Sequence, residues 1–373
     1  MNISILLPYK ENYSKDIAGA VSLFVKDTSQ VSLYKNSIKV FGSTEKKNFL
    51  DKNYINLSLK KNFLQSSNKE YVKNFLQNPD FYKTDILEIH NRPNYIKQIR
   101  KTYNKKIFLY FHNDPLSMNG SRTNLDRDYL IHNVDKIIFN SKWSRDRFFL
   151  RSKFKDLIIN KSLICYQSTS ATSFNQNKKQ KIITFVGKLN TAKGFDIFGN
   201  TIIKILNQFK DWKAYIIGDE PREKMFFEHK NLFNLGFKHN DFILNFLKKV
   251  SISVISSRWD EPFGRTSLEA ASRGCAVIIS NRGGLPETAS NSIILKNLNV
   301  NEIYKEIKKL IINPILLKKI QKNNLKSFLF DHKFIANLID NQRKDLFLFN
   351  NLFIKKNKLL KIMHITNLNE RFN

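Results

Sequence analysis

A short stretch in the second half of the chain concentrates the residues whose types and spacing could do chemistry. Glu261 and Glu269 have seven residues between them, namely PFG (262–264) and then Arg265–Leu268. The proline and glycine favour a turn, so the pattern predicts a helix that begins at Arg265. The first N–H groups of a helix attract anionic oxygens, whereas carboxylates accept hydrogen bonds from hydroxyl groups. Together these residues suit a phosphorylated sugar.

Two predicted strands position this stretch. SISVISS (251–257) and CAVIIS (275–280) are apolar, β-branched runs of the length typical of strands buried in a parallel sheet. Strand, loop, helix and strand in this order place the helix N-terminus at the carboxyl end of the sheet, where open α/β sheets bind ligands. Similar runs at NISILLP (2–8), IFLYF (107–111) and KIITFV (181–186) repeat the pattern. The fold class predicted from these segments is α/β.

WDEPFGRTSLEA (259–270), followed by GCAVIISNRGGLPE (274–287), resembles the donor-sugar motif of glycosyltransferase family 4. The resemblance covers most of the chain and implies the GT-B fold, in which two doubly wound, Rossmann-like domains face each other across a cleft. It implies that Glu261 binds the donor sugar and that Glu269 binds the ribose. The other donor-binding positions that it implies are Phe263, Gly264, Arg265, Thr266, Ser267 and Leu268, the last four through their backbone amides.

Two cations in KLNTAKG (188–194) resemble the phosphate-binding pair of the same family. They are Lys188, which is usually Arg in the family, and Lys193. A pair of cations can stabilise a departing diphosphate electrostatically, so the resemblance implies neither a metal nor a cofactor. His112 resembles the histidine that approaches the donor sugar across the cleft. We therefore predict Lys193, Glu261 and His112 as catalytic residues; surface lysines and a core histidine are the structural alternatives.

Three further candidates lie in the first half of the chain. Gly19 resembles the glycine-rich loop that brings backbone close to donor phosphate, although the family usually has two adjacent glycines and Ala18 stands first here. His90 and Arg92 lie in IHNRP (89–93), a segment similar to that of bacterial enzymes that build surface polysaccharides. We predict that these two residues contact the acceptor. Helix packing for Gly19 and a structural role for His90 are the alternatives.

A polar segment, QSTSATSFNQNKKQ (167–180), is the best candidate for a domain boundary. We expect an N-terminal acceptor-side domain at 1–170 and a C-terminal nucleotide-sugar-binding domain at 181–345. A tail at 346–373 would either cross back to the first domain, as in GT-B enzymes, or belong to the edge of another module.

The chain of 373 residues is strongly basic, with 63 Lys and Arg against 32 Asp and Glu and a net charge of +31. This charge suits an anionic substrate, an anionic membrane or nucleic acid, but an AT-rich genome also produces Lys-rich proteins. RDRFFLRSKFKD (145–156) interleaves basic and aromatic residues and predicts peripheral contact with anionic lipid; a packed helix with a solvated face is the alternative. RNA-binding signatures are absent from the sequence.

The two cysteines of the sequence argue against a disulfide framework or metal cluster, and no apolar run approaches the roughly 18 residues of a membrane span. We expect a cytoplasmic protein.

The sequence therefore predicts a retaining glycosyltransferase of the hexosyltransferase type. It would move a sugar from a UDP- or GDP-sugar to a saccharide or lipid-linked acceptor in surface polysaccharide or lipopolysaccharide synthesis. One alternative is a GT-B enzyme that uses a nucleotide sugar without transfer, as an epimerase does. A nucleic-acid-binding protein would account for the charge but would leave WDEPFGRTSLEA unexplained.

Overall fold

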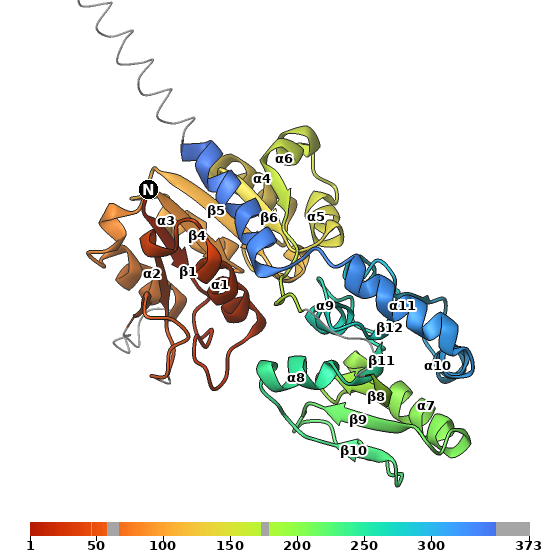
Figure 1. Ribbon diagram of the computed structural model, residues 1–373. Helices are drawn as coiled ribbons and strands as arrows, with labels where there is room; N and C mark the ends of the chain where they lie inside the picture. The colour runs from red at the N-terminus through yellow and green to blue at the C-terminus, as the bar shows by residue number, and fades with distance from the viewer. Residues whose placement is uncertain (46, 58–66, 173–178, 348–373) are drawn as a thin grey trace, which may run out of the picture.

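The computed structural model describes residues 1–45, 47–57, 67–172 and 179–347, and its strands form two parallel sheets (Figure 1). The first sheet has seven strands in the order β3-β2-β1-β4-β5-β6-β7. Its strands are β1 (Ile3–Leu6), β2 (Ile38–Gly42), β3 (Tyr54–Asn56), β4 (Ile86–His90), β5 (Lys106–Phe111), β6 (Lys136–Phe139) and β7 (Ser162–Ile164). The strand order reverses between β1 and β4, which is the topological switch point of a doubly wound sheet.

The second sheet has six strands in the order β10-β9-β8-β11-β12-β13 and reverses between β8 and β11. Its strands are β8 (Gln180–Val186), β9 (Lys213–Ile217), β10 (Leu232–Asn234), β11 (Val250–Ile255), β12 (Ala276–Ser280) and β13 (Ile293–Leu295). The prediction of an α/β protein with two doubly wound sheets is confirmed.

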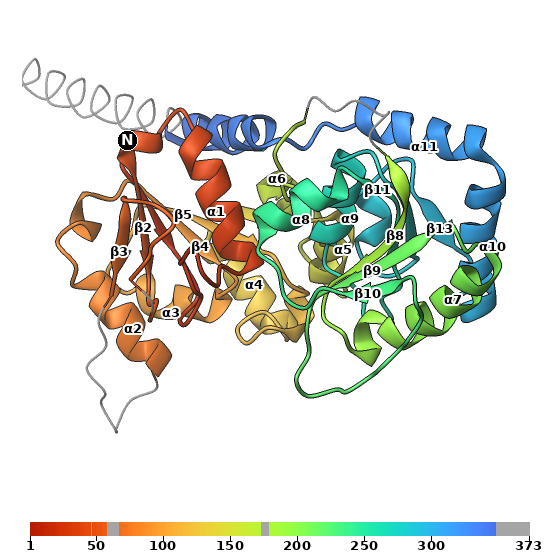
Figure 2. The same ribbon diagram turned by 60° about the horizontal axis from the view of Figure 1, so that its bottom comes forward.

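Helices cover both faces of each sheet (Figures 1 and 2). The first half contains α1 (Ala20–Val31), α2 (Ser67–Leu76), α3 (Ile96–Ile99), α4 (Asn124–Asn133), α5 (Lys142–Phe149) and α6 (Lys155–Lys161). The second half contains α7 (Phe195–Gln208), α8 (Asn240–Leu247), α9 (Arg265–Ser272), α10 (Val300–Ile312) and α11 (Pro314–Lys326).

Each sheet has a hydrophobic core on both of its faces because successive side chains of a strand point to opposite sides. In β1, Leu6 joins one core cluster, whereas Ile3 and Ile5 join the other. In β11, Ile252 and Val254 lie on one face of the second sheet, and the other face has its own cluster. This burial on both faces explains why the strands are continuous apolar runs.

A further helix at 332–347, here called the return helix, lies on the first sheet although it follows the last helices of the second half (Figure 2). Its Ile335 and Ile339 belong to the same core cluster as Phe24 of α1. Arg343 donates two hydrogen bonds to the buried carboxylate of Glu88 on β4, at 2.7 and 2.8 Å. The crossing therefore starts at residue 332, whereas we expected the C-terminal domain to run to 345. Most of the predicted tail, 348–373, lies outside the described residues.

Candidate active site

A cavity of about 260 Å³ lies where the carboxyl ends of the two sheets meet. His112 and Asn140, which follow β5 and β6, line it from the first sheet. Gly187 and Ser257, which follow β8 and β11, line it from the second. The loop before α9 and part of η6 (Thr191–Lys193) also line the cavity. Both halves of the chain therefore build this site, which is called the first cavity below.

The N-terminus of α9 opens into this cavity. Gly264 precedes the helix with φ of +106°, and Gly264, Arg265 and Thr266 line the cavity. The amides of Ser267 and Leu268 already donate to the Gly264 carbonyl, at 3.1 and 3.4 Å. Within the part of the chain that the structure describes, the amides of Arg265 and Thr266 have no acceptor. Two of the four predicted amides are thus open to an anion, because the first turn of the helix uses the other two.

Lys193 lies opposite this helix and forms an ion pair with Glu261. Its position is fixed locally, because Asn190 accepts a hydrogen bond from the Lys193 amide at 2.9 Å. The next residue, Gly194, has φ of +68°, and a Cβ there would stand 1.9 Å from the Ser256 carbonyl oxygen. The Lys-Gly step therefore needs its glycine, which lets η6 approach the end of β11 closely. Lys188 is exposed and does not line the cavity.

His112 lines the cavity but uses both ring nitrogens on protein partners. Its Nε2 lies 2.8 Å from Nδ1 of His90, and its Nδ1 lies 3.3 Å from the Gln167 side-chain nitrogen. Burial lowers the pKa of His112 to about 3, so the ring is neutral near pH 7. The neutral ring brings no positive charge to the site, and a sugar hydroxyl would have to replace one of its two protein partners to bond to it.

The remaining candidates of the first half lie away from the first cavity. His90 is buried behind His112 and stacks on Tyr110, with ring centroids 4.2 Å apart. Burial, and then the neighbouring His112, lowers the pKa of His90 well below its usual value. Arg92 donates to the Asn91 carbonyl at 2.8 Å, and neither His90 nor Arg92 lines the cavity.

Gly19 lies at the start of α1 against a carboxylate of the protein itself. A Cβ on Gly19 would stand 2.5 Å from Oε1 of Glu11, and the same oxygen accepts from the Ser22 amide at 3.3 Å. Glu11 thus occupies the helix N-terminus where we expected donor phosphate. Sequence inspection missed Glu11 because nothing in its local pattern marks it as a cap eleven residues ahead of its partner.

Glu269 is buried on α9 and accepts two hydrogen bonds, from Nε of Arg265 at 2.7 Å and from the side chain of Asn240 at 2.8 Å. Beyond Arg265 lies a second cavity of about 530 Å³, which is lined by residues of α1 and α8. These two helices lie next to each other in Figure 2. Arg265 lines both cavities, and Asn240 lines the second. Glu269 itself lines neither cavity; it lies behind Arg265, the residue that lines both.

Hydrogen bonds between the two halves of the chain hold the loop before α9 in place. The Glu287 carboxylate accepts from the amides of Lys142 and Trp143, at 2.7 and 2.9 Å, and so caps the N-terminus of α5. The Ser141 hydroxyl donates to the Pro262 carbonyl at 2.6 Å. The GGLPE segment (283–287) therefore connects the motif loop to the first half.

Residues 167–327 match the family model described as glycosyl transferases group 1. These residues form a domain of this family. Spore coat protein SA of Bacillus subtilis is 23% identical over 319 residues, which are 77% of this chain and 82% of that protein.

Two solved structures share the fold. HepE of Anabaena, in complex with UDP-glucose, has a TM-score of 0.70 at 15% identity and covers 92% of this chain and 99% of its own. WaaG, a glycosyltransferase involved in lipopolysaccharide biosynthesis, has a TM-score of 0.64 at 12% identity, covering 91% and 98%. At these identities the likeness shows the fold alone, which is GT-B as predicted.

The protein is a glycosyltransferase that uses nucleotide sugars, as the motif predicted. Sequence inspection missed Asn240 and Gln167, which lie at the start of α8 and on the predicted linker. It also missed Asp27, although Asp27 follows Phe24 by three positions on the buried face of α1. A carboxylate at such spacing is a signal that could have been used.

Among the described residues, none of the helices is long and apolar enough to cross a membrane.

Proposed function

We propose that the protein is a retaining glycosyltransferase that moves a sugar from a nucleotide diphosphate sugar to a saccharide or lipid-linked acceptor. The observation that carries this proposal is the Lys193–Glu261 pair, which faces the two open amides of α9 in one cavity between the sheets. A cation and free amides suit a diphosphate, and a carboxylate suits sugar hydroxyls. Retention of the anomeric configuration follows the family.

The two cavities suggest how the donor lies. The sugar and diphosphate would occupy the first cavity, with the diphosphate on Lys193 and the amides of Arg265 and Thr266. The ribose would reach Glu269, and the base would enter the second cavity, where Phe237 and His239 offer ring faces. Since Lys188 is exposed beside the first cavity, it would contribute a screened charge to the same diphosphate.

The chemistry needs no protein nucleophile in this arrangement. Glu261 is the one carboxylate among the described residues that line the first cavity, and Lys193 already neutralises it. The bond between the sugar's anomeric carbon and the phosphate oxygen breaks, and the acceptor oxygen bonds to the same face of that carbon. The acceptor's proton passes to the departing phosphate oxygen. The protein stabilises the growing phosphate charge with fixed cations and dipoles.

The relatives support the class of donor and the biological setting. HepE was solved with UDP-glucose, which supports a UDP-sugar for this chain, and WaaG acts in lipopolysaccharide biosynthesis. The role of WaaG fits the similarity of IHNRP to surface-polysaccharide enzymes. We therefore propose surface polysaccharide or lipopolysaccharide synthesis as the setting.

A donor panel tests the proposal. The purified protein is incubated with UDP- and GDP-sugars, with and without mixed saccharide and lipid-linked acceptors, and released nucleotide and altered sugars are measured. We expect nucleotide release from one class of donor, increased by an acceptor that gains the sugar. Conversion of the donor sugar without nucleotide release would instead support an epimerase-like enzyme. No turnover and no binding of either nucleotide would contradict the proposal.

We also propose peripheral contact with an anionic bilayer through the segment between α5 and α6 together with α6. Exposed apolar side chains lie on the segment, at Leu150 and Phe154, and on the helix, at Leu157 and Ile159, and the basic residues Arg151 and Lys153 lie on the segment. Arg145 and Arg147 contribute less than the sequence implied because they pair with Asp146 and Asp114. Flotation with vesicles rich in phosphatidylglycerol but not with pure phosphatidylcholine, lost at high salt, is the expected result. Equal flotation with both vesicles would contradict an electrostatic contact.

A further inference from the structure

The guanidinium of Arg265 is fixed at two of its nitrogens and left open at the third. Its Nε donates to Glu269 at 2.7 Å, and its Nη2 lies 3.5 Å from Oδ2 of Asp27. Nη1 is buried and has no hydrogen-bond partner within the described part of the chain. A buried guanidinium N–H without an acceptor is unfavourable, so this atom is expected to meet one when the site is filled.

The position of Arg265 indicates which acceptor that would be. The side chain lies between the first cavity, which contains the proposed diphosphate site, and the second, which has room for the nucleoside. A donor that spans both cavities would carry its diphosphate past this guanidinium. Phosphate oxygens are the strongest acceptors on such a molecule, and the planar fork of arginine suits them well.

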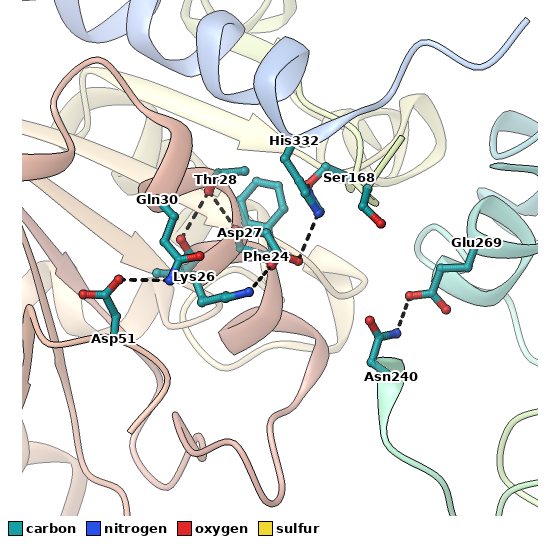
Figure 3. Close-up of polar contacts among 12 residues, drawn as sticks. Phe24, Lys26, Asp27, Thr28, Gln30, Asp51, Ser168, Asn240, Glu269 and His332 are labelled. Carbon is teal, nitrogen blue, oxygen red and sulfur yellow. Dashed lines mark hydrogen bonds and ion pairs between the residues drawn. The ribbon is translucent and has the colours of Figure 1, made fainter. Parts of the chain in front are cut away.

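The contact to Asp27 crosses from one half of the protein to the other. Asp27 lies on α1 of the first half, 3.1 Å from Nζ of Lys26 and 3.8 Å from Nε2 of His332 on the return helix. Figure 3 shows Asp27 between these two side chains, with the Asn240–Glu269 pair on the facing half. His332 is itself bonded to the Ser168 hydroxyl at 2.9 Å. Asp27 is thus held by its own half and presented to Arg265 of the other.

We propose that the Arg265 side chain is a donor-binding group that contacts the diphosphate through Nη1, and that Asp27 is its positioning residue across the domain boundary. This inference rests on the proposed function and assigns a role beyond the backbone amide of Arg265. It has a consequence for binding, because Arg265 has this fixed geometry only when the two halves are together. Donor affinity then depends on a contact that the first half of the chain supplies to the second.

Calorimetry with UDP and uridine, or with GDP and guanosine if the wild type prefers GDP, tests this inference. Arg265→Gln should weaken nucleoside diphosphate binding roughly 10- to 100-fold, the range for a lost charge-assisted hydrogen bond, and should change nucleoside binding much less. Asp27→Asn should give a smaller loss. The double variant should bind no worse than Arg265→Gln, because Asp27 acts through Arg265.

Two further variants control the experiment. Arg100→Gln removes an equal charge from an Arg–Asp pair at the amino end of β5 and β6, and should leave affinity unchanged. Arg265→Lys keeps the charge but loses the paired N–H donors of the guanidinium, so its affinity for the nucleoside diphosphate should lie between those of the wild type and Arg265→Gln. This variant replaces Arg265→Gln in the test if Arg265→Gln does not fold. If Arg265→Gln lost equal affinity for the nucleoside diphosphate and the nucleoside, this inference would be overturned and the proposed function would stand. The same holds if Arg265→Gln bound the nucleoside diphosphate as tightly as Arg100→Gln does. A wild type that binds neither nucleotide would overturn the proposed function as well.

Discussion

Replacing Lys193 by alanine removes the cation closest to the proposed leaving group. In the structure its ammonium group pairs with Glu261, and the two side chains are 31% and 12% exposed. The diphosphate is anionic before reaction, but its charge increases on the bridging oxygen as the sugar departs. A cation fixed at that oxygen stabilises the transition state more than the bound substrate, which is the condition for raising kcat.

The structure allows the size of this effect to be estimated. At an effective dielectric of about 20, a cation about 4 Å from an anionic oxygen contributes roughly 4 kcal/mol before desolvation is subtracted. Loss of one preorganised group commonly lowers rate about 10²- to 10³-fold. Because Lys193 is nearly one-third exposed, water screens part of its charge, and we expect a loss near the lower end, roughly 10²-fold.

The assay is nucleotide release with the donor identified by the panel, measured at saturating donor and in single turnovers. Lys193→Arg should recover part of the rate because the charge is retained while the geometry changes. In the double variant Lys193→Ala/Glu261→Gln, the increase in activation free energy should not exceed the sum of the increases in the two single variants. The reason is that the two residues share one contact. Lys181→Ala, at the opposite end of β8 and paired with Asp211, is the matched control that should retain full activity.

A normal kcat with a raised KM in Lys193→Ala would refute this reasoning. That result would mean that Lys193 binds substrate and transition state equally, so the proposed stabilisation of the leaving group would be wrong.

Three further predictions concern affinity, stability and pH. Glu269→Gln should weaken nucleotide-sugar binding by about 1.5–3 kcal/mol, because a charged acceptor of the ribose is lost; unchanged affinity by calorimetry would remove Glu269 from the site. Arg343→Met should lower the free energy of unfolding by about 3–5 kcal/mol, because Glu88 and Asp340 would stay buried without their cation, and denaturant titration would contradict this with a loss below about 1 kcal/mol. The folded pKa of His112, about 3, lies below its unfolded value of about 6.5, so the unfolded state binds more protons below pH 6.5. The stability this histidine contributes is complete above about pH 6.5 and decreases toward pH 3, so His112→Gln should make unfolding less sensitive to pH between 7 and 4; an unchanged pH profile would argue against the buried neutral ring.

The sheet pattern and the motif loop were accessible from sequence because their signals are local. Apolar runs such as 251–257 and 275–280 became β11 and β12, and Pro262 with Gly264 marked the start of α9. Each of these features depends on a few neighbouring residues and on burial on both faces of a parallel sheet. The same locality made the placement of the α9 amides predictable.

Contacts between distant segments were not accessible in this way. His90 seemed exposed to ligand because it ends a strand, but the next strand places His112 in front of it. Glu11 caps α1, and Asp27 meets Arg265, over separations that no sequence period encodes. The start of the return helix was misplaced for a similar reason, because only the fold brings Arg343 to Glu88.

The central claim is that the donor's diphosphate binds between η6 and the N-terminus of α9. A crystal structure of the protein with UDP, or with GDP if that nucleotide binds more tightly, tests it most directly. The account predicts phosphate oxygens within hydrogen-bond distance of the amides of Arg265 and Thr266 and of the Lys193 ammonium group, with the ribose hydroxyls on Glu269. A nucleotide bound with its phosphates away from α9, for example at the start of α1, would contradict it.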